Sequence, residues 1–196
     1  MKLVLATNNQ GKVREFARIL EPLGIEVMTQ KEAGVHLSPE ENGKTFAENA
    51  RIKALAVYRA TGLPTVADDS GLCVDALDGE PGVYSARYYG EETPYEEKNR
   101  RLIEEVNASG KARTARFVAH ITCVLSEEQI LDCEGVCEGQ IGHAPAGDGG
   151  FGYDPIFYVG GKSFAQLDGQ EKDAISHRGK ALQKLYGQLD ALAKNQ

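Results

Sequence analysis

The stretch that decides the fold is Leu63-Pro64-Thr65-Val66-Ala67, followed by Asp68-Asp69-Ser70-Gly71-Leu72. The first five residues have the length and apolar character of a short buried strand. The polar residues after them predict a turn where this strand ends, and ligands of open α/β sheets bind outside strand ends. Neighbours on an extended chain point to opposite faces, so we expect Asp68 and Asp69 to differ in role, one facing a ligand and the other the scaffold. An ordinary Asp-Ser-Gly turn without function is the alternative.

Composition limits the partners that the chain can have. Its 196 residues suffice for one domain, residues 1–196, with a substantial core. The net charge of −7 argues against a nucleic-acid polymer but not against a small polyanion held by lysines and a metal. The sequence has no membrane span, and its apolar start is too short for a signal peptide, so we expect a cytoplasmic protein. The cysteines lack zinc-knuckle spacing and are interpreted as reduced core thiols: Cys73, Cys123, Cys133 and Cys137.

A polar loop follows the first predicted strand, residues 2–6. The loop reads Thr7-Asn8-Asn9-Gln10-Gly11-Lys12, and a helix with an apolar stripe comes directly after it. A strand, a glycine-containing turn and a helix aim backbone N–H groups and the positive helix end at an anion. The loop therefore predicts phosphate binding, to which Lys12 adds a charge. Capping of the helix by an asparagine is the alternative.

Residues 38–45, Ser38-Pro39-Glu40-Glu41-Asn42-Gly43-Lys44-Thr45, nearly match the phosphate-binding loop G-x-x-x-x-G-K-[ST]. We interpret the match as a coincidence, because Ser38 replaces the first glycine and the glutamates would repel phosphate. Thr45 and Glu48 instead predict a capping box for the following helix. Glu40 and Glu41 are better placed as oxygen ligands of a hard cation.

The helix predicted over residues 45–60 carries a charge on its apolar face. Steps of about 100° per residue place Lys53 between Phe46 and Val57, with Asn49 one turn earlier on the same side. A lysine that faces inward is costly unless it meets an anion, so Lys53 is predicted to contact a substrate close to Asp69. Extension of the side chain along the surface to solvent is the alternative.

The middle of the chain predicts architecture rather than chemistry. A helix opens at Thr93-Pro94 and runs to about Val106. Residues 116–125 and 130–141 are expected to be the two arms of a hairpin. These elements would form a second lobe or a dimer surface.

The segment Gly147 to Gly152 satisfies G-x-G-x-x-G, but a dinucleotide site requires a strand before the motif and a helix after it. Here Pro145 precedes the motif, and Pro155 with a β-favouring run follows it. We interpret the segment as a pliable loop in which Phe151 stacks on a flat heterocycle and Asp154 reads its edge. A surface loop with Phe151 tucked into the core is the alternative.

Ser176-His177-Arg178-Gly179 leads into a terminal helix with a buried leucine-rich stripe. If Ser176 is the cap, His177 and Arg178 lie in the first turn, where cations oppose the helix dipole. This placement indicates an anion or a polar ligand nearby. An exposed basic first turn is the alternative.

Five segments, in order over nearly the whole chain, together resemble one protein family. They are Thr7 to Lys12, Glu40-Glu41 with residues 45–50, Ala67 to Leu72, residues 149–155, and Ser176 to Gly179. Pro81-Gly82-Val83-Tyr84-Ser85-Ala86-Arg87 belongs to the same pattern. The sequence resembles the inosine triphosphate pyrophosphatase family, also called Ham1-like. Each motif is modest, but the combination is specific.

This resemblance implies an α/β fold with an elongated mixed β-sheet flanked by helices, in two lobes with the active-site cleft between them. It implies a homodimer that hydrolyses ITP, dITP and XTP to the monophosphate and pyrophosphate. It also implies dependence on Mg²⁺, with Mn²⁺ as a substitute metal.

The resemblance also assigns roles to residues. Asp69 would accept the proton of the attacking water and would bind the metal together with Glu40 or Glu41. Thr7 to Lys12 would hold phosphate, and residues 151–154 with His177 and Arg178 would surround the base. The full set of substrate contacts would be Thr7, Asn8, Asn9, Gln10, Gly11, Lys12, Lys53, Ser70, Phe151, Gly152, Tyr153, Asp154, Lys172, His177 and Arg178.

The chemistry of these residue types agrees with hydrolysis of a triphosphate. Mg²⁺ commonly binds through carboxylates and phosphate oxygens, and Asp69, Lys12 and Lys53 can supply a base and charge stabilisation. Two other classes of function remain open: a nucleotide sensor without catalysis, and a P-loop phosphotransferase centred on Gly43-Lys44-Thr45.

Overall fold

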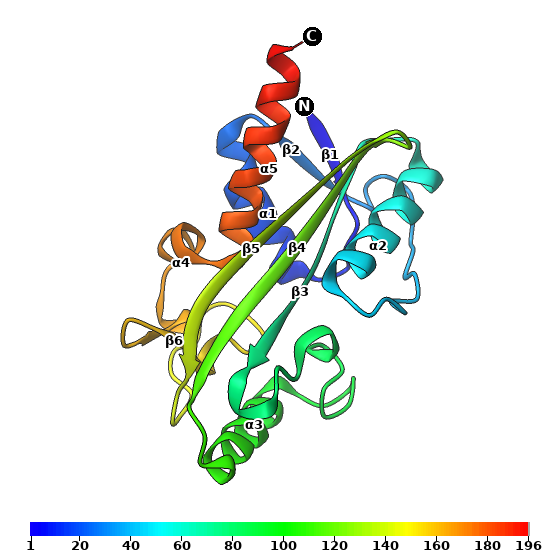
Figure 1. Cartoon of the computed structure of the whole chain (residues 1–196). Coiled ribbons are helices and arrows are strands. Elements are labelled where there is room, and N and C mark those ends of the chain that lie inside the picture. Colours follow the sequence, from blue (N-terminus) through cyan, green and yellow to red (C-terminus); the bar gives the residue numbers. More distant parts are fainter. Residues whose placement is uncertain (196) are drawn as a thin grey trace. The chain divides into compact units, whose positions relative to one another are not determined.

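The computed structural model describes residues 1–195, and this part of the chain forms an α/β fold of seven strands and five α-helices (Figure 1). The strands are β1 (Lys2–Leu5), β2 (Glu26–Thr29), β3 (Thr65–Val74), β4 (Thr114–Ser126), β5 (Gln129–Ile141), β6 (Phe157–Val159) and β7 (Lys162–Ser163). The helices are α1 (Gln10–Leu20), α2 (Phe46–Thr61), α3 (Tyr95–Ser109), α4 (Gly169–Ile175) and α5 (His177–Lys194). Within the described residues, no helix has both the length and the hydropathy needed to cross a membrane. The predicted α/β class is confirmed.

The strands form one mixed sheet in the order β2-β1-β3-β4-β5-β6-β7. β1 pairs in parallel with β2, where Leu3 lies opposite Val27, and with β3, where Leu5 lies opposite Val66. β6 pairs antiparallel with β5 and with β7. The predicted arms at residues 116–125 and 130–141 lie within β4 and β5, which are neighbours in the sheet.

The chain divides into two compact units, which we call unit 1 and unit 2. Unit 1 contains Met1–Asp69, Ala119–Gly135 and Arg178–Gln196, of which the structure describes residues up to 195. Unit 2 contains Ser70–Val118 and Val136–His177.

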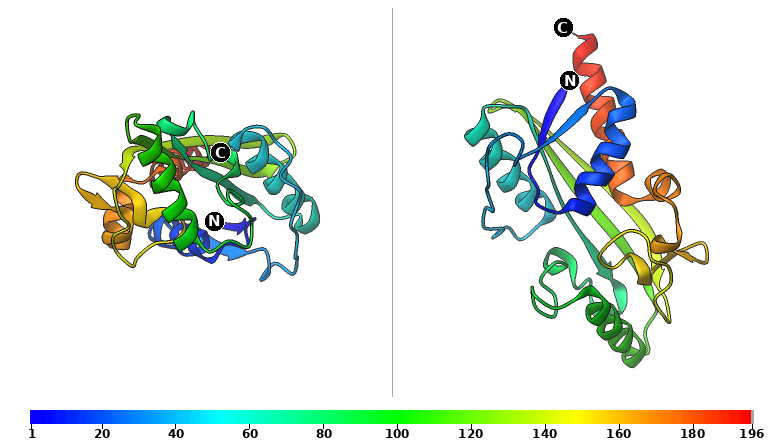
Figure 2. Two further views of the ribbon diagram at one scale, coloured as in Figure 1. Left: turned by 90° about the horizontal axis from the view of Figure 1, so that it is seen from below. Right: turned by 180° about the vertical axis from the view of Figure 1, so that it is seen from behind.

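Helices cover both faces of the parallel strands in unit 1 (Figures 1 and 2). Leu3, Leu5 and Val66 pack in one cluster with residues of α1 and α5. The alternating residues Val4, Ala6 and Ala67 pack in another cluster with Ala54 and Val57 of α2. Because both faces are buried, β1 reads as a continuous apolar run rather than as an alternating one.

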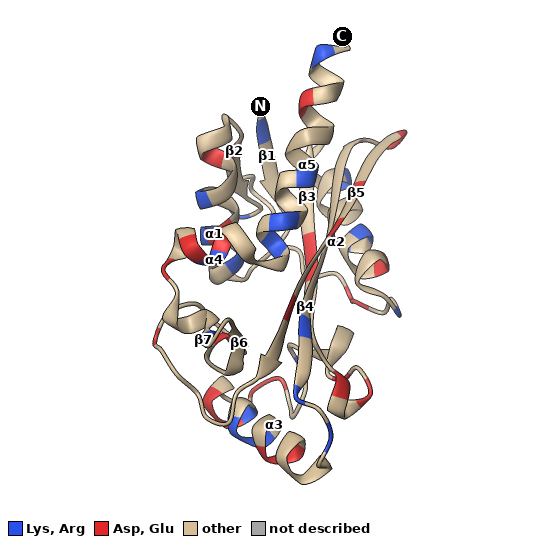
Figure 3. Cartoon of the chain, turned by 60° about the vertical axis from the view of Figure 1, so that its left-hand side comes forward, with Lys and Arg blue, Asp and Glu red and all other residues tan. Residues whose placement is uncertain are grey.

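Unit 2 is held together by α3 and a group of aromatic residues. Leu102, Ile103 and Val106 of α3 belong to a core that also contains Phe117, Phe157 and Phe164. The rings of Phe117 and Phe157 have centroids 4.6 Å apart, close to edge-on. On its outer side α3 carries charges of both signs (Figure 3), and Arg100 pairs with Glu104 one turn later at 2.6 Å.

The turn predicted at Asp68 to Gly71 is wrong, because β3 continues through these residues to Val74. β1 is only four residues long and pairs with β3 as far as Val66, whereas β4, the other neighbour of β3, is thirteen residues long. Sheet pairing therefore overrides the low strand propensity of Asp, Ser and Gly.

Candidate active site

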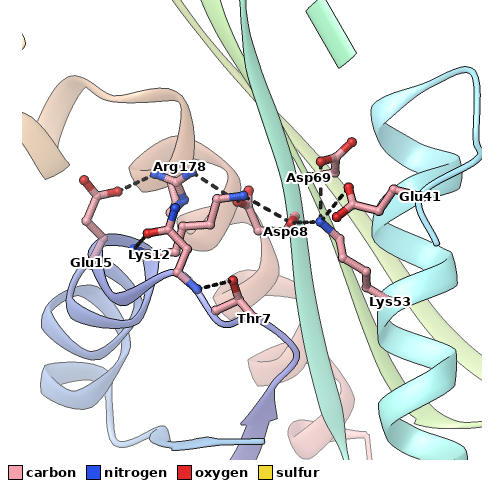
Figure 4. A network of polar contacts seen from close by, with 9 residues as sticks. Thr7, Lys12, Glu15, Glu41, Lys53, Asp68, Asp69 and Arg178 are labelled. Carbon is pink, nitrogen blue, oxygen red and sulfur yellow. Dashed lines mark hydrogen bonds and ion pairs between the residues drawn. The ribbon is translucent and has the colours of Figure 1, made fainter. Parts of the chain in front are cut away.

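Asp68 and Asp69 are adjacent on β3 and face opposite ways (Figure 4). The Asp68 carboxylate meets Lys12 of α1, and the Asp69 carboxylate meets Lys53 of α2. Both residues lie just beyond Val66, the last residue of β3 that is paired with β1. The carboxyl end of a parallel strand is the common place for a ligand in such sheets. The prediction that the two carboxylates face opposite ways is confirmed.

Asp68 is part of a buried network of four charged residues in unit 1. Its Oδ2 lies 2.8 Å from Nζ of Lys12 and 3.1 Å from Nη2 of Arg178, in the first turn of α5. Nη1 of Arg178 donates a hydrogen bond to Oε2 of Glu15 on α1. Exposure is 1% for Asp68, 3% for Glu15 and 2% for Arg178. The alternative of an exposed basic first turn is therefore wrong for Arg178.

The charges of this network balance one another, and this controls ionisation. Burial alone would raise the pKa of Asp68, but the charges of Arg178 and Lys12 outweigh it and hold the pKa well below its usual range. Burial lowers the pKa of the Lys12 ammonium, and the nearby positive charges of Lys53 and Arg178 act in the same direction, whereas Asp68 opposes it. Asp68 is thus a permanent anion that serves to hold cations.

On the other face of β3, Lys53 joins two carboxylates. Its Nζ lies 3.4 Å from Oδ1 of Asp69 and 3.3 Å from Oε2 of Glu41, and it donates a hydrogen bond of 2.8 Å to the backbone oxygen of Asp68. The Lys53 side chain is only 12% exposed. The prediction that Lys53 faces inward beside Asp69 is confirmed, and the alternative of extension into solvent is wrong.

Asp69 differs from Asp68 in having an oxygen without a protein partner. The residue is 6% exposed, and Oδ2 is buried with no hydrogen bond from any residue in the range 1–195. Burial raises the pKa of Asp69, and the charges of Glu41 and Asp68 add to this, while Lys53 and Lys12 oppose it. Buried polar atoms are almost always satisfied, so this oxygen is suited to a water, a cation or a substrate atom.

The Asp69 face of β3 carries carboxylates that are possible ligands of a metal ion. Among residues 1–195 there is no ready-made group of three or more His, Cys, Asp or Glu side chains around one point. Mg²⁺, however, is usually held by one or two carboxylates together with phosphate oxygens and water. Glu41 and Asp69, which meet at one ammonium, fit that pattern. Glu40 is exposed, so the geometry favours Glu41 of the two predicted glutamates.

The loop before α1 is ordered by its own side chains. Oδ1 of Asn9 accepts a hydrogen bond from the Lys12 N–H at 3.2 Å, and Oγ1 of Thr7 accepts one from the Asn9 N–H at 3.2 Å. Oδ1 of Asn8 accepts from Gln30 at 2.7 Å. Capping by Asn9, given above as the alternative to phosphate binding, is therefore present. It is compatible with an anion at the first turn of α1, where Gln10 is exposed and Gly11 is buried.

In unit 2, Asp154 and Lys172 form a buried ion pair. Nζ of Lys172 lies 2.5 Å from Oδ2 of Asp154 and 4.9 Å from the ring centroid of Phe151. The same carboxylate oxygen accepts the Phe151 N–H at 3.0 Å. Lys172 and Asp154 are each 3% exposed, while Phe151 is half-buried. Three predicted substrate residues are thus brought together in one cluster.

Three other predicted residues of unit 2, His177, Tyr153 and Gly152, contact an aromatic ring, a backbone carbonyl and a side-chain amide respectively. The His177 ring stacks on Phe117 with centroids 4.7 Å apart, and the Tyr153 hydroxyl donates to the Ser85 carbonyl at 2.6 Å. The carbonyl of Gly152 accepts from Asn99. Ser70 is half-buried on β3.

Sequence reasoning missed Glu15 and Gln30, and it placed Asn49 on the Lys53 side of its helix without giving it a role. Gln30 is 2% exposed and orients Asn8, and Asn49 is fully buried beside the Glu41 segment. Glu15 is one helical turn from both Gly11 and Ile19, which are buried, so the argument applied to Lys53 could have identified it. No comparable signal marks Gln30.

Comparisons with known proteins agree over almost the whole chain. The sequence pattern of the Ham1 family matches residues 3–188. A dITP/XTP pyrophosphatase of Thermus thermophilus is 52% identical over 188 residues, covering 94% of this chain and 90% of that protein. One from Shigella flexneri is 49% identical over 196 residues, covering 97% and 98%. The structure of a HAM1 protein from Coxiella burnetii superposes with a TM-score of 0.88 at 43% identity, covering 97% of this chain and 99% of that one. The chain belongs to the Ham1 family.

Proposed function

We propose that this protein hydrolyses the non-standard purine nucleotides dITP, XTP and ITP to the nucleoside monophosphate and pyrophosphate. The observation that carries the proposal is Asp69, a buried carboxylate with Lys53 at 3.4 Å and with one oxygen that accepts no hydrogen bond from residues 1–195. Relatives of about 50% identity that are named dITP/XTP pyrophosphatases support the choice of substrate.

In this proposal, Glu41 and Asp69 hold a divalent cation, with Mg²⁺ as the natural ion and Mn²⁺ as a substitute. When bound, the cation would neutralise charge on the phosphate oxygens. Glu41 and Asp69 are both paired with the Lys53 ammonium. If the cation took the place of Lys53 as their partner, the ammonium could pair with a phosphate oxygen of the nucleotide. Glu40 is left as a peripheral charge.

The residues of unit 1 supply the chemistry of hydrolysis. Asp69 is the proton acceptor for the attacking water, because its carboxylate is buried at the site and its Oδ2 is available. Lys12 and Lys53 stabilise the charge that develops on phosphoryl oxygens. Lys12 is pre-positioned, since Asp68 holds it at 2.8 Å and Arg178 holds Asp68. Thr7 to Gly11 present the N-terminal end of α1 to the anion.

Residues of unit 2, Ser70 among them, are proposed to select the purine base. Phe151 offers a ring face, while Asp154, Lys172 and His177 offer polar atoms. Gly152 and Tyr153 shape the loop. Arg178 is the next residue after His177 in the chain. Hydrogen bonds tuned to a 6-keto purine without the 2-amino group would reject adenine and guanine, because the wrong base leaves buried partners unpaired.

The test is release of pyrophosphate from a panel of nucleotides. With Mg²⁺, dITP should give one pyrophosphate per monophosphate, and dATP and dGTP should react much more slowly. Chelation by EDTA should stop the reaction, and added Mg²⁺ should restore it. Equal rates on all nucleotides would contradict the specificity, whereas saturable binding of dITP without product would replace the enzyme by a nucleotide sensor.

A further inference from the structure

The position of Glu41 depends on a segment without regular structure. Residues 30–45 lie between β2 and α2 and contain no helix or strand. The first part of this segment is fixed, because Leu37 packs against the core around α2 and its carbonyl accepts a hydrogen bond of 3.0 Å from Gln30. Ordering a residue costs backbone conformational entropy. The place of Glu41, four residues further on, therefore requires a second anchor.

Asn49 of α2 is that second anchor. It is 0% exposed, and its Oδ1 accepts the N–H of Gly43 at 2.8 Å. The contact is so close that a Cβ at Gly43 would lie 2.6 Å from this oxygen and 2.7 Å from Cβ of Glu48. Only a glycine lets the backbone approach the asparagine in this way.

Asn49 and Lys53 are four residues apart and lie on the same face of α2. Lys53 approaches the Glu41 carboxylate at 3.3 Å, and Asn49 holds the backbone two residues later. Because the same Lys53 lies 3.4 Å from Asp69, α2 sets the distance between the two carboxylates.

We propose that Asn49 is a positioning residue that places Glu41 for binding of the divalent cation. The inference rests on the proposed function in one respect, namely that Glu41 and Asp69 hold this cation. Asn49 itself touches neither the cation nor the nucleotide; it acts through the Gly43 backbone. Second-sphere groups of this kind typically change metal affinity by 10–100-fold.

A merely structural role for Asn49 predicts something different. The start of α2 already has other stabilising contacts, since Thr45 accepts the Glu48 N–H at 3.1 Å and Glu48 accepts the Lys44 N–H at 2.5 Å. If Asn49 only strengthens this region, its loss lowers the free energy of unfolding and leaves the affinity for metal unchanged.

The test is Asn49→Leu, which keeps the size of the side chain and removes the acceptor. Two quantities are measured: binding of Mn²⁺ to the protein without nucleotide, by electron paramagnetic resonance, and the Mg²⁺ concentration for half-maximal pyrophosphate release from dITP. We expect the dissociation constant for Mn²⁺ and the Mg²⁺ concentration for half-maximal activity each to rise by about tenfold. The kcat at saturating Mg²⁺ should stay close to that of the wild type. Gly43→Ala disrupts the same hydrogen bond from the side of the loop and should shift both constants in the same direction. This second variant keeps the test possible if Asn49→Leu does not fold.

The matched control is Thr122→Val, which removes a partly buried hydrogen bond of unit 1, from the buried Thr122 to Asp132 at 2.6 Å. It should lower stability and leave both metal constants unchanged. The proposal is overturned if Asn49→Leu and Gly43→Ala bind Mn²⁺ and respond to Mg²⁺ like the wild type. A wild type that releases no pyrophosphate would refute the proposed function instead, and Mn²⁺ binding would still decide the role of Asn49.

Discussion

Asp68 and Asp69 are neighbours in the chain, yet their surroundings make them chemically unlike. The Asp68 carboxylate is paired with Lys12 at 2.8 Å and with Arg178 at 3.1 Å, so its negative charge is compensated by cations of the protein itself. Asp69 shares one oxygen with Lys53 and keeps the other without a hydrogen bond from residues 1–195. Alternation along a strand therefore separates a carboxylate that is paired with two cations from one that keeps an available oxygen.

The first prediction concerns Asp69 as the base. Asp69→Asn keeps the shape of the side chain but removes its basicity, so kcat on dITP should fall by about 10²–10⁴-fold, with a much smaller change in KM. Pyrophosphate release at saturating dITP and Mg²⁺ measures this. Asp132→Asn, a change on β5 outside the proposed site, is the control. A near-normal kcat for Asp69→Asn would remove it from this role.

Arg178 supports a second prediction at this scale. Arg178→Met leaves Glu15 and Asp68 buried without their shared cation, so the free energy of unfolding should fall by about 3–5 kcal/mol. Urea denaturation near neutral pH measures the loss. Arg51→Met is the matched control, because Arg51 is half-exposed and lies 3.5 Å from Asp132; its loss should cost less than about 1 kcal/mol. Equal losses for the two variants would contradict the importance of the buried network.

Asp68 also predicts a dependence of stability on pH. Its pKa is lowered in the folded chain, so the unfolded chain takes up the proton first as the pH falls. The stability that Asp68 contributes is fully present above the unfolded pKa of about 3.9 and declines below it. The difference in unfolding free energy between wild type and Asp68→Asn should be equal at about pH 7 and about pH 5, and smaller at about pH 3. A difference that already shrinks between the two higher values would argue against a lowered pKa.

At the scale of elements, α2 shows how a sequence motif can mislead. Gly43-Lys44-Thr45 looks like the end of a phosphate-binding loop, but Thr45 is the N-cap of α2 and Lys44 is exposed. In a capping box, the Glu48 carboxylate would accept a hydrogen bond from the N–H of the N-cap residue Thr45. Here it accepts one from the N–H of Lys44, the residue before, so only the contact from the Glu48 N–H to Thr45 is as predicted.

This arrangement gives a fourth prediction. Thr45→Ala should lower the free energy of unfolding by about 1 kcal/mol because the first turn of α2 loses its cap. Lys44→Ala should leave pyrophosphate release from dITP almost unchanged. Denaturation and the pyrophosphate assay measure the two effects. Loss of activity in Lys44→Ala would instead support a phosphotransferase centred on this loop.

At the scale of the whole molecule, resemblance to the Ham1 family implies a homodimer, and we carry this as the fifth prediction. A dimer of this chain should have about twice the mass of 21.2 kDa in multi-angle light scattering coupled to size exclusion. Dilution over a wide concentration range serves as the control for weak association. A mass of one chain throughout that range would contradict the expectation.

Much of the fold could be predicted because its signals are local. The apolar stripe and caps predicted α2 within one residue of each end, and the start of α5 at His177 follows Ser176 as expected. The inward position of Lys53 followed from helical periodicity alone. The glycine-rich segment 147–152 lies outside helices and strands, in agreement with its interpretation as a loop.

The remainder could not be predicted because it depends on partners that are distant in the chain. Asp68 to Gly71 have the composition of a turn, and only the neighbouring long strand β4 keeps them extended. Arg178 meets Glu15 across 163 positions and Asp68 across 110. Contacts between residues so far apart in the chain cannot be predicted from the periodicity of a short segment.

By itself, the sequence determined the α/β class, most helices, the family and the residue types of the site, because periodicity, capping and motif order are properties of short stretches. The tertiary structure decided which of these residues are free for chemistry. Burial and long-range ion pairs hold Asp68, Arg178 and Glu15 together, and they leave Asp69 with an oxygen that no residue in the range 1–195 satisfies. That difference arises from electrostatic pairing between distant segments, which no local pattern encodes.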